Sequence, residues 1–261
     1  MDYKKFKKEA RREKDAIVPV LFLDPIATPV TFLLKKTFKK LTPTQITISR
    51  LVFFSPLVIA LLLLAPFFGD IFYLLAGIGF YVTLLTDCMD GQLARGTKAI
   101  SKKGDLLDCI SDRFSNITFF TLLFSFAIRI NNMFLLIGSF LILILKIFQM
   151  VIVIRISESK FLEKSNPDAY LSERIIVEKI GIDFVYRKFF ALIKPLKIKR
   201  IDPRRSCFDQ YIITIIIPTI LIYFQKFQTV TYFLCFLTVF FIVYYLYKIK
   251  TIISAILNQT E

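Results

Sequence analysis

Long apolar runs separated by short polar breaks dominate this chain. The runs cover roughly residues 44–66, 71–95, 105–129, 133–156, 208–224 and 229–256. Most reach or approach the length of about 20 residues with which an apolar helix crosses a bilayer core. Turn-forming residues mark two of the breaks, at Gly69 and at Asn131. The pattern predicts an all-α integral membrane protein with six transmembrane helices.

Polar segments flank and interrupt this hydrophobic domain. Residues 1–16 are a basic run that we expect to be a solvated cytoplasmic tail, and residues 257–261 form a short C-terminal tail. Residues 17–40 mix apolar side chains with lysines, which favours an interfacial amphipathic helix beside anionic head groups over a plain basic linker. Residues 17–256 are then one membrane domain. Within it, the polar segment 157–207 is predicted to be a cytoplasmic or interfacial insertion.

Basic residues are distributed unevenly between the two sides that six spans would define. The net charge is +15, and the N-terminal run, the loop after the second apolar run and residues 157–207 hold most of the lysines and arginines. The opposite loops hold mainly Arg129 and Lys226. The positive-inside rule therefore predicts a multi-pass protein of the cell membrane whose second-to-third-helix loop faces the cytoplasm.

Composition narrows the chemistry further. The 56% hydrophobic content makes a membrane surface a better explanation of the positive charge than nucleic acid, for which no binding motif is present. The chain has no histidine, which excludes imidazole catalysis and histidine-bound metal. Its four cysteines are scattered along the chain, so neither a disulfide framework nor a zinc site is predicted.

Acidic residues gather where the second apolar run ends and the third begins. Ionisable side chains at membrane depth are costly and are functional candidates for that reason. Two sets of residues each share one face of a predicted helix. They are Asp87, Asp90, Gly91 and Ala94 at i, i+3, i+4 and i+7, and Gly104, Asp108 and Asp112 at i, i+4 and i+8. If the two helices are antiparallel neighbours, four carboxylates converge.

Four carboxylates in a low dielectric repel one another unless a cation neutralises them. With oxygen ligands only, one or two Mg²⁺ or Mn²⁺ ions are the natural choice, and Ca²⁺ is the alternative. Mg²⁺ is commonly shared between carboxylates and substrate phosphates, and Arg95 offers a guanidinium for phosphate. The residues therefore predict a metal site that handles a phosphate ester.

Two stretches of sequence resemble a known family. Asp87 to Asp112 reads D-x-x-D-G-x-x-A-R-x8-G-x3-D-x3-D, which resembles the signature of the class I CDP-alcohol phosphotransferases. Pro43 to Arg50 (PTQITISR) is similar to the family's P-N-x-[IV]-T-x-x-R entry to the first span, with Thr44 where the family often has Asn. The longer motif matches at every specified position.

The resemblance implies a reaction. A phosphatidyl-type group passes from a CDP-alcohol, commonly CDP-diacylglycerol or its ether analogue, to an acceptor hydroxyl, and CMP is released in phospholipid biosynthesis. It further implies that Asp87, Asp90 and Asp108 bind the metal, and that Asp112 both binds metal and takes the acceptor proton. The residues implied to bind the CDP-alcohol are Gly91, Ala94, Arg95, Ser101, Gly104, Thr44 and Thr47. A homodimer is expected, as is common in the family.

The acceptor is less sharply indicated. Arg113, Lys146 and Arg155 are candidate contacts for a phosphate-bearing acceptor, although Lys146 could equally snorkel or pair with a carboxylate. The Asp112-Arg113 pair resembles family members that use inositol or inositol phosphate. Glycerol 3-phosphate, serine or an amino alcohol are the alternatives, as is a soluble CDP-alcohol with a lipid acceptor.

A different class of function is a cation transporter, in which intramembrane carboxylates and Lys146 would form the transport site. Transporters favour Gly- or Pro-interrupted spans in repeated halves. The sequence has no such repeat, and its aspartates cluster at one membrane face. The pattern therefore favours the transferase.

Overall fold

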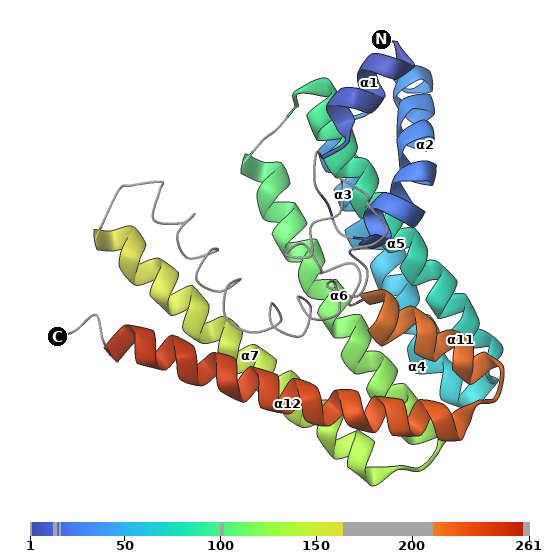
Figure 1. The fold of residues 1–261 in the computed structure, drawn as a ribbon, viewed down its shortest axis with the longest axis vertical. Helices are drawn as coiled ribbons and strands as arrows, with labels where there is room; N and C mark the ends of the chain where they lie inside the picture. Colours follow the sequence, from blue (N-terminus) through green and yellow to red (C-terminus); the bar gives the residue numbers. More distant parts are fainter. Residues whose placement is uncertain (1, 13–14, 16, 100–101, 164–210, 258–261) are drawn as a thin grey trace, which may run out of the picture.

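The computed structural model describes residues 2–12, 15, 17–99, 102–163 and 211–257. These residues fold almost wholly into helices, as Figure 1 shows, which confirms the predicted all-α class. In chain order the helices are α1 (Tyr3–Ala10), α2 (Asp24–Thr37), α3 (Pro43–Ser49), α4 (Ser55–Phe68), α5 (Ile71–Thr97), α6 (Lys102–Arg129), α7 (Met133–Glu163), α11 (Ile217–Tyr223) and α12 (Phe227–Leu257). Three π-helical turns, Pro19–Leu23, Arg50–Phe54 and Ile212–Ile216, lead directly into α2, α4 and α11.

The first membrane-length helix begins at a capping box. The Thr42 hydroxyl accepts a hydrogen bond from the Gln45 amide (3.3 Å), and the Gln45 side chain accepts one from the Thr42 amide (2.9 Å). Pro43 occupies the first helical position, where its missing N–H costs nothing. The start of the motif PTQITISR therefore fixes where α3 begins.

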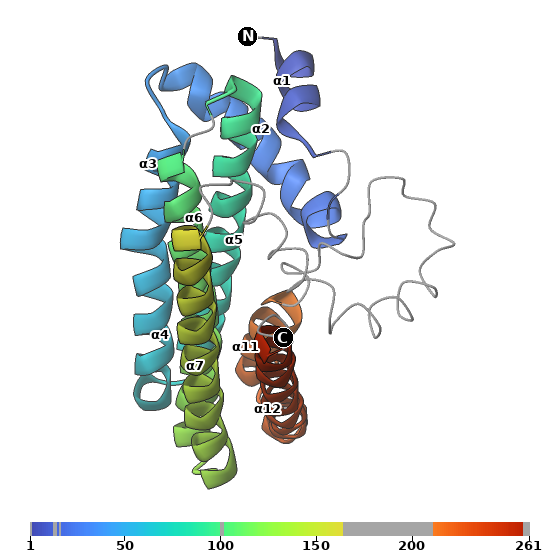
Figure 2. The same cartoon turned by 90° about the vertical axis from the view of Figure 1, so that its left-hand side faces the viewer.

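Helices α4, α5 and α6 form the centre of the fold. α4 packs against both α5 and α6, α11 packs on α5, and α7 packs against α6 and α12. In Figure 1, α7 and α12 run beside each other and lean away from the other helices, and Figure 2 shows α12 together with α11 on one side of α4 and α7. The hydrophobic core that joins the helices includes the buried side chains of Leu62, Phe80, Leu123, Phe126 and Leu234.

Three tight turns reverse the chain at the same end of the molecule (Figure 1). Each contains a residue with positive φ: Gly69 (φ 108°), Asn131 (φ 52°) and Gln225 (φ 57°). The value at Gly69, at the end of α4, suits glycine because no Cβ collides with the backbone there. The predicted breaks at Gly69 and Asn131 are confirmed. At this end Arg129 forms a 3.4 Å ion pair with Asp70.

Three helices in the described part are long and apolar enough to cross a membrane: Pro43–Phe68, Ile71–Thr97 and Phe227–Tyr247. Shorter apolar helices cover Ile117–Arg129, Met133–Phe148 and Ile212–Tyr223. Large apolar side chains face outward on these helices; Phe53, Phe67 and Phe236 are 69%, 75% and 65% exposed. An outward apolar surface suits lipid and not water. A membrane protein is therefore supported, while the count of six spans stays a prediction.

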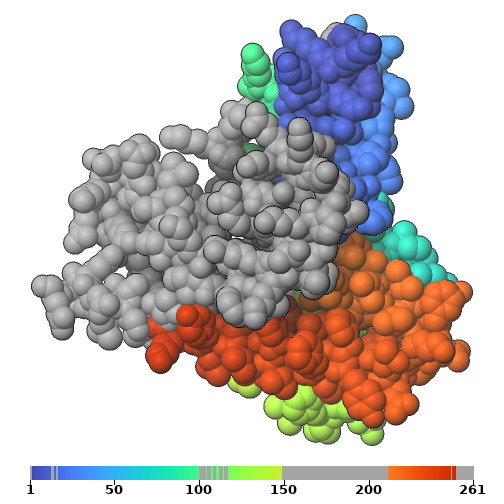
Figure 3. Space-filling view, in the orientation of Figure 1, coloured from blue at the N-terminus to red at the C-terminus, as the bar shows by residue number. Residues whose placement is uncertain are grey.

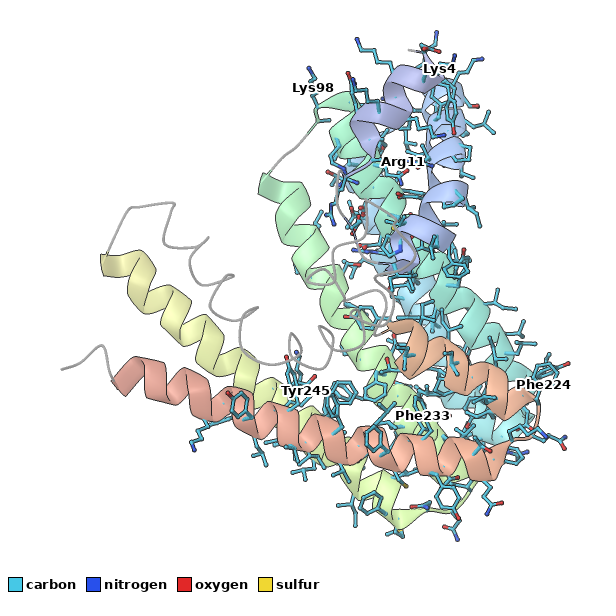
Figure 4. The ribbon with its side chains drawn as sticks, viewed as in Figure 1. Lys4, Arg11, Lys98, Phe224, Phe233 and Tyr245 are labelled. Atoms are coloured by element: carbon cyan, nitrogen blue, oxygen red, sulfur yellow. The ribbon has the colours of Figure 1, made fainter. Side chains whose placement is uncertain are left out.

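The N-terminal region departs from the sequence-based expectation. A solvated tail was predicted for residues 1–16, and this is wrong for Tyr3–Ala10, which forms α1 and buries Phe6 and Ala10 completely. α1 packs against α2 and α5, and together α1 and α2 form one end of the molecule (Figure 3). Lys4 of α1 and Lys98 at the end of α5 lie at this end (Figure 4).

Helix α2 lies within the segment 17–40 and is anchored to the fold. Ala27, Thr28 and Thr31 are fully or almost fully buried, and α2 packs along α5. The Lys35 amino group donates to the carbonyls of Lys39 (2.7 Å) and Leu41 (2.9 Å), so this lysine secures the chain after α2. Most of the predicted insertion 157–207 lies outside the described residues; its first part, to Glu163, continues α7.

Candidate functional site

The second span carries the first half of the predicted metal site. Asp87 and Asp90 lie one turn apart on α5, Asp90 buried and Asp87 partly buried. The buried surroundings make a charged carboxylate expensive unless other groups stabilise it. Each of the two carboxylates has such a partner on the neighbouring span.

Thr47 of α3 is the partner of Asp90. Its hydroxyl donates to Asp90 Oδ2 at 2.8 Å, in a contact that is buried on both sides. The same hydroxyl lies 3.3 Å from the Pro43 carbonyl, but it has one proton and the shorter, charge-assisted contact with Asp90 is the stronger. Thr47 was predicted to close the CDP-alcohol pocket, and the structure places it directly against a predicted metal ligand.

Arg50 is the partner of Asp87. Its guanidinium forms an ion pair with the carboxylate, and the arginine is buried (4% exposed). Arg50 opens the π-helical turn Arg50–Phe54, and such turns are frequent at functional sites. The sequence motif contained Arg50, but no role was predicted for it.

The contacts Thr47–Asp90 and Arg50–Asp87 lie one helical turn apart on the same pair of helices. Thr47 and Arg50 are three residues apart, as are Asp87 and Asp90, and the pairs run in opposite order along the two helices. Antiparallel packing of the first two spans therefore brings the two family-like motifs together. Because the motifs are separated by about 40 residues of apolar sequence, this meeting is a property of the fold and not of either motif alone.

The arginine of the signature lies one turn beyond the aspartates. Arg95 Nε donates to the carbonyl of Ala10 (2.7 Å), and Arg95 Nη1 lies 3.1 Å from where a Cβ on Gly91 would stand. The guanidinium therefore covers the glycine of the D-G-x-x-A-R motif. Ala94 and Thr44 are partly buried, on α5 and α3 respectively.

The second half of the predicted site lies on α6. Asp108 and Asp112 are on this helix, and Gly104 is partly buried near its start. α3 packs against both α5 and α6, so both aspartate-bearing helices have a common neighbour. α5 and α6 run in opposite directions (Figure 1), and at the end away from the aspartates the Tyr73 hydroxyl lies 3.0 Å from Ser125 Oγ. The convergence of the four aspartates stays a prediction.

Several predicted site residues lie outside the described part of the structure. Ser101 is one of these residues. For four others only the helix backbone is described: Asp108, Asp112, Arg113 and Arg155. Their predicted roles therefore stay predictions.

The described residues include side chains of the kind that a hard divalent cation prefers as ligands. Asp87 and Asp90 offer carboxylate oxygens, the ligands that Mg²⁺ and Mn²⁺ prefer. Among the described side chains no cluster of three acidic, cysteine or histidine residues occurs. Asp108 and Asp112, two of the four predicted ligands, are not among these side chains. The chemistry of the donor set and its buried position agree with the predicted metal.

Lys146 is engaged by an aromatic ring. Its amino group lies 5.1 Å from the centre of the Tyr245 ring, so α7 and α12 meet in a cation–π contact. Tyr245 is buried in the core. The sequence-based alternatives for Lys146 did not include such a contact with an aromatic ring. The contact does not test the predicted role of Lys146 in acceptor binding.

Two further contacts at the site have no counterpart in the sequence motifs. Gln92 Nε2 donates to the buried Asp24 carboxylate of α2 at 2.7 Å. The Arg95 contact with Ala10 comes from α1. Ala10 and Asp24 lie in segments that were predicted as a tail and an interfacial helix, so neither motif pointed to these two contacts.

The ion pair at Arg50 leads to a stability prediction. Arg50→Met leaves the Asp87 carboxylate without its cation, and we expect a loss of about 3 kcal/mol, the low end for breaking a buried pair, because Asp87 keeps some exposure. Thermal unfolding in detergent measures this. The double variant Arg50→Met/Asp87→Asn should recover most of the loss.

A matched control is available at the other end of the molecule. Arg129→Met breaks the more exposed pair with Asp70 and should cost less than about 1 kcal/mol. Equal losses for Arg50→Met and Arg129→Met would contradict a special role for the buried pair.

Comparison with known proteins places these motifs in a longer match. The family model described as CDP-alcohol phosphatidyltransferase matches residues 40–193, which is more than half of the chain. The match contains both motifs and most of the 157–207 segment. A search of curated proteins finds no match.

Proposed function

This chain belongs to the CDP-alcohol phosphatidyltransferase family, and we propose that it transfers a phosphatidyl-type group from a CDP-alcohol to an acceptor hydroxyl in phospholipid biosynthesis. The donor is CDP-diacylglycerol or its ether analogue, and CMP is the leaving group. One observation carries most weight: two distant motifs meet, so that Thr47 and Arg50 hold the carboxylates of Asp90 and Asp87 in a buried site.

The reaction divides into tasks for this chain's residues. The acceptor oxygen forms a bond to the lipid-side phosphorus, the bond from that phosphorus to the CMP oxygen breaks, and the acceptor proton passes to the Asp112 carboxylate. Arg95, whose terminal nitrogens lie over Gly91, would bind the diphosphate through those nitrogens. Thr44, Ala94, Ser101 and Gly104 would complete the CDP-alcohol pocket.

A divalent cation, Mg²⁺ or Mn²⁺, would be held by Asp87, Asp90, Asp108 and Asp112, and would neutralise charge that develops on the diphosphate. Before that ion binds, Arg50 and Thr47 stabilise the two aspartates of α5. The site is thereby kept in its ligand-binding arrangement without leaving buried charge unpaired.

For the acceptor we propose inositol phosphate or another polyol phosphate, because of the resemblance at the Asp112-Arg113 pair. Arg113, Lys146 and Arg155 are its proposed contacts. Glycerol 3-phosphate, serine and an amino alcohol are the alternatives. We further propose six spans in the cell membrane, a site that opens to the cytoplasm and a homodimeric assembly.

An acceptor panel tests this proposal. The purified protein is incubated with CDP-diacylglycerol and Mn²⁺, and inositol 1-phosphate, myo-inositol, glycerol 3-phosphate and serine are added in turn. We expect CMP release to be stimulated most by inositol 1-phosphate. Stimulation by another acceptor alone would replace the acceptor assignment and keep the reaction class.

A further inference from the structure

The N-terminal helix α1 is seated on the signature-bearing end of α5. Phe6 is fully buried, and a Cβ added to Gly96 would stand only 2.3 Å from Phe6 Cε2. The Phe6 ring also contacts Phe32 of α2, with ring centres 5.7 Å apart. Glycine at position 96 therefore makes room for the ring that anchors α1.

The last residue of α1 contacts the signature arginine. The Ala10 carbonyl accepts a hydrogen bond of 2.7 Å from Arg95 Nε, and a helix C-terminus is a favourable place for a cation. A guanidinium is planar, so fixing its Nε edge also fixes the plane of its terminal nitrogens. Those nitrogens lie over Gly91, at 3.1 and 3.6 Å from the position of an added Cβ.

A second set of contacts holds α1 in register with α2 and α5. Arg11 Nε donates to Thr28 Oγ1 at 3.1 Å, and Arg11 Nη2 lies 3.3 Å from the Asp24 carbonyl. The Asp24 carboxylate in turn accepts the 2.7 Å hydrogen bond from Gln92. The end of α1 is thus tied to α2, and α2 is tied to the turn of α5 between Gly91 and Arg95.

We infer that α1 is a positioning element of the CDP-alcohol site, in which Phe6 seats the helix on Gly96 and the Ala10 carbonyl orients Arg95 toward the donor diphosphate. The inference rests on the proposed function, because it assigns Arg95 to that diphosphate. α1 precedes residues 40–193, so this part of the site lies outside the family match. Phe6 and Ala10 act through Arg95 and touch no reacting atom.

The first test is Phe6→Ala in the full-length protein. We expect about tenfold weaker binding of CMP in the presence of Mn²⁺, the order expected when one hydrogen bond to a charged group is lost, and a similar rise in the KM for the CDP-alcohol. The KM for the acceptor should change less than about twofold, because its contacts are elsewhere. Phe6→Leu should bind CMP more tightly than Phe6→Ala and nearly as tightly as wild type, since leucine fills most of the space that the Phe6 ring occupies beside Gly96.

The matched control is Lys8→Ala. It removes a cation from an exposed position of the same helix and should leave CMP affinity within about twofold of wild type. A loss as large as that of Phe6→Ala would mean that the positive charge of α1, and not its docking, governs binding.

Gly96→Ala tests the same contact from the other side. The added methyl must displace Phe6, so the single variant should weaken CMP binding as Phe6→Ala does. In the Phe6→Ala background the methyl has room, and the double variant should be no weaker than Phe6→Ala alone. Additive losses would contradict a shared cause.

The outcomes separate this inference from the proposed function. CMP binding is titrated directly, and each variant is first shown to keep its wild-type melting temperature within a few degrees in detergent. Unchanged or tighter CMP binding in both Phe6→Ala and Gly96→Ala overturns the positioning role. Failure of the wild type to release CMP from any CDP-alcohol overturns the proposed function instead.

Discussion

Asp112→Asn should lower the rate of CMP release by about a thousandfold, the middle of the range for losing a general base. The asparagine side chain keeps the size of the aspartate but cannot take the acceptor proton at neutral pH. Binding of the CDP-alcohol should largely survive, because the residues predicted to contact the donor, among them Arg95, and three of the four predicted metal ligands are unchanged. The expected signature is therefore a large fall in kcat with a small change in the donor KM.

Asp105→Asn is the control for this variant. It makes the same chemical change on the same helix, at an acidic position outside the predicted metal set. Its CMP release should stay within about threefold of wild type, as for a residue that contacts neither metal nor substrate. Turnover retained in Asp112→Asn would remove the residue from its proposed role as base.

Asp90→Asn should raise the Mn²⁺ concentration needed for half-maximal activity by about a hundredfold or more. Losing even an outer-shell partner of a metal ligand costs about 10–100-fold in affinity, and a direct ligand should cost at least as much. The amide oxygen can still accept the hydrogen bond from Thr47, so the contact between α3 and α5 should be preserved. The variant should therefore lose metal affinity while its melting temperature changes little.

Mn²⁺ binding followed by electron paramagnetic resonance measures this effect without turnover. Asp70→Asn is the control, because Asp70 is an aspartate just before α5, at the opposite end of that helix, where it pairs with Arg129. A Mn²⁺ affinity in Asp90→Asn equal to that of wild type would exclude Asp90 as a ligand.

Much of the helical framework could be predicted from run lengths and breaks alone. An apolar run of 20 or more residues has few alternatives to a helix, and Gly69 and Asn131 mark turns that the structure contains. α1 was missed because its lysines outnumber its apolar residues. The apolar residues Tyr3, Phe6 and Ala10 are spaced at i, i+3 and i+7, which was the available signal for one buried face.

The sequence predicted how the site residues of one motif lie relative to one another, but not which residues of the two motifs are in contact. The i, i+3 spacing correctly predicted that Asp87 and Asp90 lie one turn apart on a helix. Their partners Thr47 and Arg50 are about 40 residues away, and periodicity carries no information about which helix packs beside which. The contacts from Ala10 and Asp24 depend in the same way on tertiary packing of the N-terminal segment.

Metal-dependent transfer from a CDP-alcohol is tested by measuring CMP release by the purified protein in mixed micelles with CDP-diacylglycerol and inositol 1-phosphate. The predicted result is CMP release that requires Mg²⁺ or Mn²⁺, stops with a chelator, resumes when metal is restored, and yields one lipid product per CMP. Folded protein that releases no CMP from ester, ether or soluble CDP-alcohols, whichever metal and acceptor are supplied, would exclude this activity.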